Sequence, residues 1–354
     1  MIVLFPSYAR PAAGGRKWRV TVAGMAIRPL PPTSRRRAMA VAVLKRVLAL
    51  DEPQCQSAVF QRRSAAFLFQ RLVGRRVRCT MGGIDFDGGQ TDRTGHFTAT
   101  VEIDASRFAV SAGDAGQPAG CPWVASTAWL DDDDDTDPTD DGIATGVVQL
   151  VSERGLSVIS DIDDTVKVTN VANRRELLAN TFVREFFAVP GMDAVFRRWR
   201  EEATAFHYVS ASPWQLCDCL TGFLRAEGLP AGSLHLKLFR LKDSTPLGRF
   251  PSRKRSKRRA IEQIMADFPG RRFLLVGDSG ERDPEVYATI ARRQPDRVAG
   301  VVIRRVAGPH RASPKRFARI ERRLPPGMLR LFTEADELVR AEPAAGGGPA
   351  PAAH

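Results

Sequence analysis

The segment that decides the fold is Leu156-Ser157-Val158-Ile159-Ser160-Asp161-Ile162-Asp163-Asp164-Thr165. Its first half is a short, nearly continuous apolar run, which is typical of a strand buried on both faces. Its second half places several carboxylates directly behind that strand. Polar groups that follow a buried parallel strand lie at the carboxyl edge of the sheet, where doubly wound folds carry their functional residues. The segment therefore predicts an α/β domain with an acidic site.

A regular alternation of strand and helix patterns continues on the C-terminal side of this segment. Short apolar runs predict further strands at 206–210, 234–238, 272–277 and 298–303. Apolar residues at helical spacing predict helices at 174–187, 192–202, 214–227, 256–268 and 284–293. Buried strands that alternate with helices form a parallel sheet covered on both faces. We therefore predict that residues 151–340 form an α/β domain with a doubly wound parallel (Rossmann-like) sheet.

Two further polar motifs follow strands of the predicted sheet, and we expect them to meet the acidic run at one edge. They are Ser210-Ala211-Ser212-Pro213-Trp214 and Gly277-Asp278-Ser279-Gly280-Glu281-Arg282-Asp283. Clustered carboxylates repel one another, and a divalent cation removes that cost. All-oxygen ligands favour Mg²⁺, which usually keeps several waters and leaves room for a phosphate. The candidate Mg²⁺ ligands are Asp161, Asp163, Asp278 and Asp283, with Asp283 holding a metal-bound water.

The same residues suit phosphate-ester hydrolysis. A carboxylate nucleophile such as Asp161 forms an aspartyl-phosphate and divides hydrolysis into two displacements. Asp163 can protonate the leaving oxygen and then serve as general base for water. Ser210 and the backbone near Ala211 can donate to the phosphate, and a lysine must supply positive charge. The basic stretch 249–259 offers Lys254 or Lys257 for that role. By itself, the run 161–165 could also be a turn whose side chains cap backbone amides.

Residues 1–150 have a different texture. Alternating apolar residues at 76–79 and 96–103, punctuated by glycine pairs, predict short antiparallel strands joined by tight turns. A short strand is expected at 18–24 and a helix at 39–50. We predict a smaller β-rich, sandwich-like domain with an exposed acidic loop at 131–141. The Ala/Gly/Pro-rich tail 341–354 is predicted to be disordered.

Composition sets only broad limits. The 354 residues are 43% hydrophobic and 26% charged, which is ordinary for globular proteins. The net charge of +13 favours contact with polyanions, but Arg-rich coding bias gives the same excess, so we expect no nucleic-acid partner from charge alone. The five scattered cysteines form no metal or redox spacing. No apolar run approaches a membrane span and the N-terminus has no secretory pattern, so we expect a cytoplasmic location.

At these motifs the chain resembles the haloacid dehalogenase superfamily. The resemblance is closer to one of its families, the actin-patch-associated phosphatidate phosphatases. It is carried over about residues 150–306 by the run from Asp161 to Thr169 (Asp161-Ile162-Asp163-Asp164-Thr165-Val166-Lys167-Val168-Thr169), by Val189-Pro190-Gly191-Met192, by the run from Phe206 to Leu216 and by the run from Phe273 to Tyr287. The resemblance implies Mg²⁺-dependent conversion of phosphatidate to diacylglycerol and phosphate. It implies Asp161 as nucleophile, Asp163 as acid/base, Ser210 on phosphate, and Asp278 and Asp283 on the metal. It favours Lys257 at the start of its helix, and Lys254 stays open.

Three functional hypotheses follow. The first is a phosphomonoesterase acting on phosphatidate, on a soluble phosphate ester or on a phosphoprotein. The stretch between Thr165 and Ser210 is too short for a large lid, so the site should admit a bulky or surface-bound substrate. The second is a phosphatase-like module that has lost turnover and binds anionic lipid or a phosphoprotein. Under either hypothesis the basic stretch 249–259 is a candidate for peripheral membrane contact. The third is a phosphoacceptor receiver domain, whose acidic pair and phosphorylated Asp lie on different strands, unlike Asp161 and Asp163.

Overall fold

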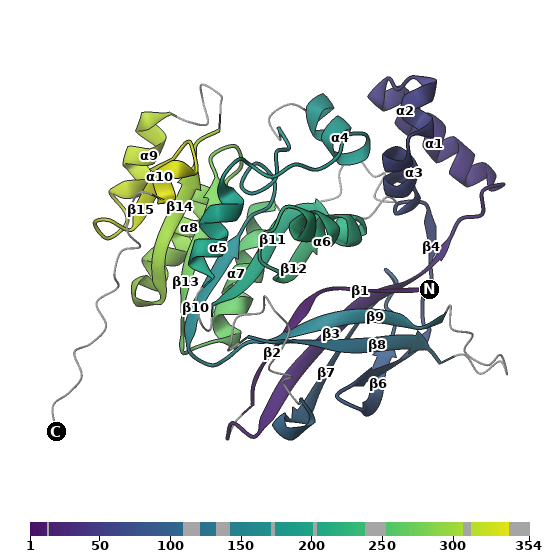
Figure 1. Cartoon of the computed structure of the whole chain (residues 1–354), viewed down its shortest axis with the longest axis horizontal. Helices are drawn as coiled ribbons and strands as arrows, with labels where there is room; N and C mark the ends of the chain where they lie inside the picture. Colours follow the sequence, from purple (N-terminus) through teal and green to yellow (C-terminus); the bar gives the residue numbers. More distant parts are fainter. Residues whose placement is uncertain are drawn as a thin grey trace.

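The computed structural model describes residues 1–12, 14–108, 121–131, 142–170, 174–200, 204–237, 253–306 and 313–339. The chain forms a β-rich N-terminal domain and an α/β domain, with a small group of helices at one side of the latter (Figure 1). The predicted acidic loop 131–141 lies outside the described residues except for Asp131. The predicted tail 341–354 lies outside them entirely.

The α/β domain is built on six parallel strands. These are β10 (Gly155–Ser160), β11 (Ala205–Pro213), β12 (Ser233–Lys237), β13 (Arg271–Asp278), β14 (Val298–Arg304) and β15 (Leu329–Phe332). Their spatial order is β12-β11-β10-β13-β14-β15, and each neighbouring pair is parallel. This is the doubly wound order in which the strand sequence reverses beside the first strand, here between β10 and β13. The predicted Rossmann-like sheet is present, with β15 as an additional edge strand.

Helices cover both faces of this sheet because successive strand residues point to opposite sides. Ile159 packs with α7 (Arg253–Asp267), α8 (Asp283–Arg293) and α9 (Pro314–Glu321). Val158 packs on the other face with α5 (Met192–Trp199), α6 (Cys217–Ala226) and α10 (Asp336–Val339). Short 3₁₀ turns, η3 (Trp214–Leu216) and η4 (Pro295–Arg297), precede α6 and β14. The sheet is therefore a buried central layer, as its apolar strands require.

Helix α4 (Arg174–Phe182) is shorter than the predicted helix at 174–187. The chain after Phe182 turns back so that Ala188 pairs with Lys167 in an isolated bridge. This return places residues 183–188 beside the acidic segment, an arrangement that helical periodicity alone does not reveal.

The N-terminal strands form one curled, nine-stranded mixed sheet. They are β1 (Ile2–Leu4), β2 (Ser7–Pro11), β3 (Lys17–Pro29), β4 (Phe69–Arg71), β5 (Arg76–Met81), β6 (Ile84–Gln90), β7 (His96–Asp104), β8 (Trp123–Leu130) and β9 (Ala144–Leu150), with a 3₁₀ turn η1 (Ala105–Arg107) after β7. All the pairs are antiparallel except β2 with β9. Strand β6, at one end of the order, contacts β7, so the sheet curls around an apolar core.

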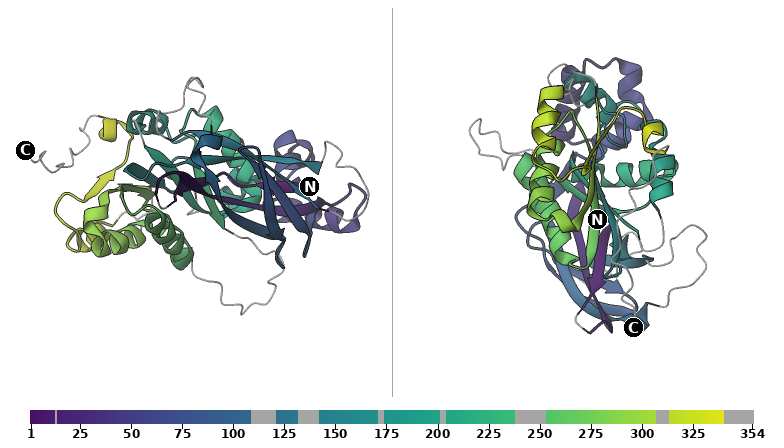
Figure 2. Two further views of the ribbon diagram at one scale, coloured as in Figure 1. Left: turned by 90° about the horizontal axis from the view of Figure 1, so that it is seen from below. Right: turned by 90° about the vertical axis from the view of Figure 1, so that its left-hand side faces the viewer.

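A helical insert interrupts this sheet between β3 and β4. It consists of α1 (Arg35–Leu48), α2 (Glu52–Gln56) and α3 (Ala58–Ala65), and it packs on α4 rather than on its own sheet. Ser34 caps α1, and Asp51 with Gln54 forms a capping box on α2. Figure 1 and the right-hand view of Figure 2 both place these helices beside the α/β domain, on the side away from the curled sheet.

The two domains share buried contacts. The Tyr8 hydroxyl donates to Asp267 at 2.7 Å, and the Tyr8 ring packs edge-on against His207. Trp214 is buried among Met25 and Ile27 of β3. His207 is fully buried in β11, as its mid-strand position predicts. Among the described residues, no helix is both long enough and apolar enough to cross a bilayer.

Candidate active site

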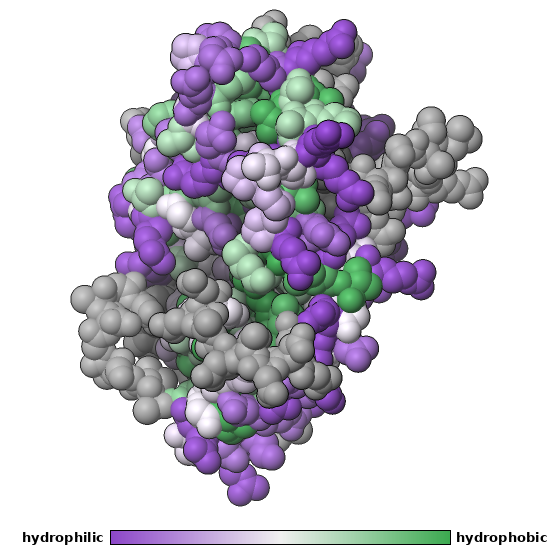
Figure 3. Space-filling view, turned by 90° about the vertical axis from the view of Figure 1, so that its right-hand side faces the viewer, coloured by the Kyte–Doolittle hydropathy of each residue, from purple (hydrophilic) through white to green (hydrophobic). Residues whose placement is uncertain are grey.

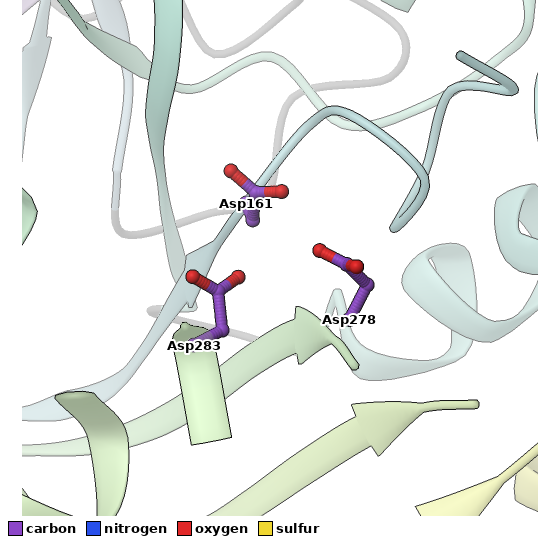
Figure 4. Close-up of side chains that lie close together, drawn as sticks. All are labelled: Asp161, Asp278 and Asp283. Atoms are coloured by element: carbon purple, nitrogen blue, oxygen red, sulfur yellow. The ribbon is translucent and has the colours of Figure 1, made fainter. Parts of the chain in front are cut away.

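Three carboxylates converge where the strand order reverses. Asp161 follows β10, Asp278 ends β13 and Asp283 begins α8, and one oxygen of each lies within 4.8 Å of the others (Figure 4). The parallel register of β10 with β13 brings the strand ends level, and Asp161 N–H donates to the Val276 carbonyl at 2.9 Å. All three side chains are buried, at 1%, 0% and 1% exposure. The sequence prediction that these motifs meet is therefore realised in space.

Lys257 reaches into this cluster from α7. Its ammonium lies 2.8 Å from Asp161 Oδ1 and 2.6 Å from Asp283 Oδ1. Burial disfavours the lysine's charge, but the nearby Asp161 and Asp283 outweigh it and hold the pKa of Lys257 well above its usual range. The side chain of Lys254 is not among those that the structure describes, nor are residues 249–252 of the basic stretch.

One lysine does not satisfy three buried carboxylates. Burial raises the pKa of Asp161 and of Asp278 well above the usual range, and repulsion from Asp283 adds to it. Asp278 Oδ2 and Asp283 Oδ2 are buried and accept no hydrogen bond from the described residues. Buried polar atoms without a partner are costly, and oxygen pairs of this kind are what a hard divalent cation binds.

Close packing at the end of β13 keeps this cluster tight. A Cβ added at Gly277 would lie 2.5 Å from Asp283 Oδ2, so only glycine fits there. Asp278 Oδ1 accepts from the Gly280 and Glu281 backbone amides, which fixes its orientation.

Arg316 of α9 fixes the turn that links Asp278 to Asp283. Its guanidinium donates to the Ser279 carbonyl at 2.7 Å and the Glu281 carbonyl at 2.9 Å, and it binds Glu285 at 2.7 and 2.8 Å. This role was not predicted from the sequence, because nothing in the local pattern around Arg316 distinguishes it from the other arginines of α9.

The Asp163 side chain is not in the three-carboxylate cluster. Its oxygens lie 2.9 Å from the Lys167 ammonium and accept from Thr169 (2.9 Å), Ser210 (3.1 Å) and Ser212 (2.6 Å). Burial alone would raise the pKa of Asp163, but the charge of Lys167 and the bonds from Ser212 and Thr169 lower it to about 2. Ser210 is thus turned to Asp163, and half-buried Ala211 follows it at the end of β11.

Asp164 shapes the turn that makes these contacts. Its backbone is in the left-handed region (φ 56°), and its Oδ1 accepts from the Thr169 and Asn170 amides at 2.9 and 2.7 Å. The capping interpretation of the acidic run therefore holds for Asp164. Lys167, Thr169 and Ser212 were missed as site residues, although each stands in a motif that the sequence analysis quoted.

Residues 156–305 match the family described as "Phosphatidate phosphatase APP1, catalytic domain". Over this segment the α/β domain is similar to that family. The chain is 35% identical over 158 residues to Phosphatidate phosphatase APP1 of Saccharomyces cerevisiae, which covers 44% of this chain and 26% of that protein. It is 32% identical over 163 residues to an uncharacterized protein of Schizosaccharomyces pombe, covering 45% and 26%. The matched part is therefore about a quarter of the length of each of these relatives.

The family segment contains the three-carboxylate cluster, Lys257 and the Asp163 network, whereas Arg316 and the helical insert lie outside it. A Bifidobacterium dentium β-glucuronidase structure covers 94% of this chain and 60% of its own at 10% identity, but its TM-score of 0.24 supports no argument about fold.

Proposed function

We propose that this protein is a Mg²⁺-dependent phosphomonoesterase of the haloacid dehalogenase type that forms an aspartyl-phosphate on Asp161, with phosphatidate as substrate. The observation that carries this proposal is the buried cluster of Asp161, Asp278 and Asp283 with the Lys257 ammonium 2.8 Å from Asp161. The phosphatidate assignment rests on the similarity of the α/β domain to this family and on the name of the yeast relative.

The donor set fits Mg²⁺. Three carboxylates and one ammonium carry a net charge of −2 when all are ionised, and the two partnerless oxygens belong to Asp278 and Asp283. Asp161 and Asp278 would hold the ion directly, and Asp283 would hold it directly or through a water. Asp163, turned toward Lys167, is not positioned as a side-chain ligand. When bound, Mg²⁺ neutralises charge on the carboxylates and on the transferring phosphoryl group.

The protein's own residues divide the reaction into two displacements. A carboxylate oxygen of Asp161 forms a bond to phosphorus while the bond to the ester oxygen breaks, and that oxygen leaves with a proton from Asp163. Water then attacks the aspartyl-phosphate, Asp163 takes its proton, and inorganic phosphate leaves. Lys257 holds Asp161 in place and offsets negative charge throughout.

The state of Asp163 in this structure suits the second displacement. Held ionised by Lys167, Thr169 and Ser212, it is in the protonation state that a general base needs. To donate in the first displacement it must first be protonated. Substrate that draws the Ser212 hydroxyl onto its phosphate would remove one of the bonds that lower the pKa of Asp163.

The test measures phosphate release from phosphatidate in micelles, sugar phosphates, nucleotides and phosphopeptides, with Mg²⁺ or with a chelator. We expect Mg²⁺-dependent release that favours phosphatidate, that vanishes in Asp161→Asn and that falls sharply in Asp163→Asn. Asp193→Asn is the matched control, because Asp193 pairs with Arg197 on the surface of α5. Full activity in Asp161→Asn would sink the nucleophile assignment. Equal turnover of soluble esters would remove the lipid assignment and leave the chemistry.

A further inference from the structure

The three most exposed large apolar side chains among the described residues lie on α1 and in the segment that returns from α4. These are Met39 at 67% exposure, Phe187 at 63% and Val43 at 57%. Val168, at 43%, adjoins Phe187, since its backbone N–H donates to the Phe187 carbonyl at 3.0 Å. Since α1 packs on α4, these side chains belong to neighbouring elements, and large apolar groups left in water on neighbouring elements mark a contact with something apolar.

Helix α1 has apolar side chains on two sides, one packed and one exposed. Val41 and Leu48 pack toward Phe60 of α3 and Phe182 of α4, which fixes the inner face of the helix. Met39 and Val43 are one turn apart and lie on its exposed face. The side of the molecule that carries the insert shows hydrophobic residues interleaved with hydrophilic ones over its upper part (Figure 3).

The charge of α1 is uniformly positive. Its sequence contains Arg35, Arg36, Arg37, Lys45 and Arg46 and no acidic residue. Arg35, Arg36 and Arg46 are exposed, whereas Lys45 pairs with Glu52 at 2.5 Å. An amphipathic helix with exposed apolar residues bordered by arginines is suited to lie at the headgroup level of an anionic bilayer.

The insert is fixed rigidly to the rim of the candidate active site. Arg63 of α3 is 1% exposed, and its guanidinium donates to the carbonyls of Asn180 (3.2 Å), Thr181 (3.0 Å) and Arg184 (2.5 Å). It also lies 3.7 Å from the centre of the Phe186 ring, and the Lys167 ammonium that binds Asp163 lies 4.6 Å from the same ring centre. A surface that held α1 would therefore hold the edge of the site as well.

We propose that the exposed face of α1, together with Phe187 and Val168, docks on an anionic phospholipid bilayer and sets the mouth of the site against the headgroups. None of these residues belongs to the basic stretch 249–259. The inference deepens the proposed function, because it assumes that the substrate is a lipid in a membrane. The charge of α1 favours this occupant, because its three exposed arginines, with no acidic residue on the helix, fit a negatively charged lipid surface.

The experiment is sedimentation of the full chain with phosphatidylcholine vesicles that contain or lack 30% phosphatidylglycerol, without Mg²⁺ or substrate. We expect binding to the anionic vesicles that weakens with salt. The double variant Met39→Ser/Val43→Ser should bind about tenfold less, because two partly buried side chains are lost from the interface. Arg35→Gln/Arg36→Gln should reduce the dependence on phosphatidylglycerol. Val147→Ser, on β9 at 39% exposure, is the matched control and should bind as the wild type does.

The outcomes separate this inference from the proposed function. Wild-type protein that hydrolyses phosphate esters but ignores anionic vesicles, or a double variant that binds them normally, overturns the docking surface and leaves the chemistry. If the wild type binds anionic vesicles and the double variant does not, but the wild type releases no phosphate from phosphatidate, the surface is supported and the proposed substrate is rejected. Light scattering supplies the third arm: a dimer that dissociates in the double variant would assign the surface to a second copy of the chain and overturn the lipid proposal.

Discussion

Removing the Lys257 ammonium should separate the structural cost of the acidic cluster from its catalytic use. In Lys257→Met the side chain stays unbranched but ends one atom earlier, and Asp161 and Asp283 lose a cation at 2.8 and 2.6 Å. Each contact has a Coulomb energy of about 6 kcal/mol at an effective dielectric constant of ~20. Much of that is cancelled by the cost of burying the lysine, so the net loss from breaking such a pair is about 3–5 kcal/mol.

This loss should depend on Mg²⁺. Without the metal the cluster changes from a net charge of −2 to −3 on losing Lys257, counting its three carboxylates as ionised. Mg²⁺ stabilises both proteins, but the variant cluster at −3 should bind it more tightly than the wild-type cluster at −2, and each tenfold gain in affinity adds about 1.4 kcal/mol to the variant's free energy of unfolding relative to that of the wild type. We therefore expect urea unfolding at pH 8 to show a large deficit in chelator and a much smaller one in Mg²⁺. Phosphate release should still fall ~10²–10³-fold, as for other lost stabilisers of transition-state charge.

Two further variants make the test decisive. Asp278→Asn removes one of the repelling carboxylates, so it should raise the free energy of unfolding in chelator and abolish the stabilisation by Mg²⁺. Lys315→Met, at an exposed position on α9, is the matched control and should alter neither. If Lys257→Met unfolds in chelator at the wild-type urea concentration, the cluster is not held together by this ammonium and the electrostatic reasoning is wrong.

Two other predictions concern the support of the site and the acid stability of the fold. Arg316→Ala frees the turn at 279–281, so the apparent Mg²⁺ affinity should fall ~10–100-fold. The fall should appear both in the Mg²⁺ dependence of phosphate release and in the Mg²⁺-induced thermal shift, and the control Arg319→Ala should change neither. Equal Mg²⁺ affinity in the two variants would contradict the supporting role of Arg316. Burial lowers the pKa of His235 to about 4, so the unfolded state takes up a proton first as the pH falls below ~6.5, and the free energy of unfolding should drop by at most about 3 kcal/mol by pH 4. Urea unfolding should show a shallower loss over this range in His235→Asn, and an unchanged slope would refute the assignment.

Much of the α/β fold can be predicted from the sequence, because buried parallel strands appear as continuous apolar runs. The strands at 156–160 and 272–277 are such runs, and their neighbours on the chain are helices, which limits the topology. Strand β15 was not predicted from the sequence, because only Phe332 of its four residues is buried, as suits an edge strand. Helix α9 was not predicted either, because its only buried residues are Phe317 and Ile320 and several of the others are basic.

The candidate site also has one part that could be predicted from the sequence and one part that could not. Asp161, Asp278 and Asp283 could be predicted because each follows a recognisable strand, and the sheet then fixes where they meet. The partners of Asp163 could not be predicted, because Lys167 and Thr169 reach its carboxylate only through a turn in which Asp164 has a positive φ. No periodic pattern encodes such a turn, since its geometry comes from side-chain bonds to the backbone.

The N-terminal region bears on the site through packing rather than through chemistry. A contiguous series of contacts runs from α1 through the buried Arg63 and the Phe186 ring to Lys167 and Asp163. Spatial continuity transmits a signal only where an element has two arrangements, and the deeply buried Arg63 instead makes the insert and the rim one rigid unit. A bilayer that holds α1 should therefore orient the site over the headgroups and leave the reactivity of Asp161 as it is. The gain from the membrane should then appear with vesicle substrates and be absent with soluble ones.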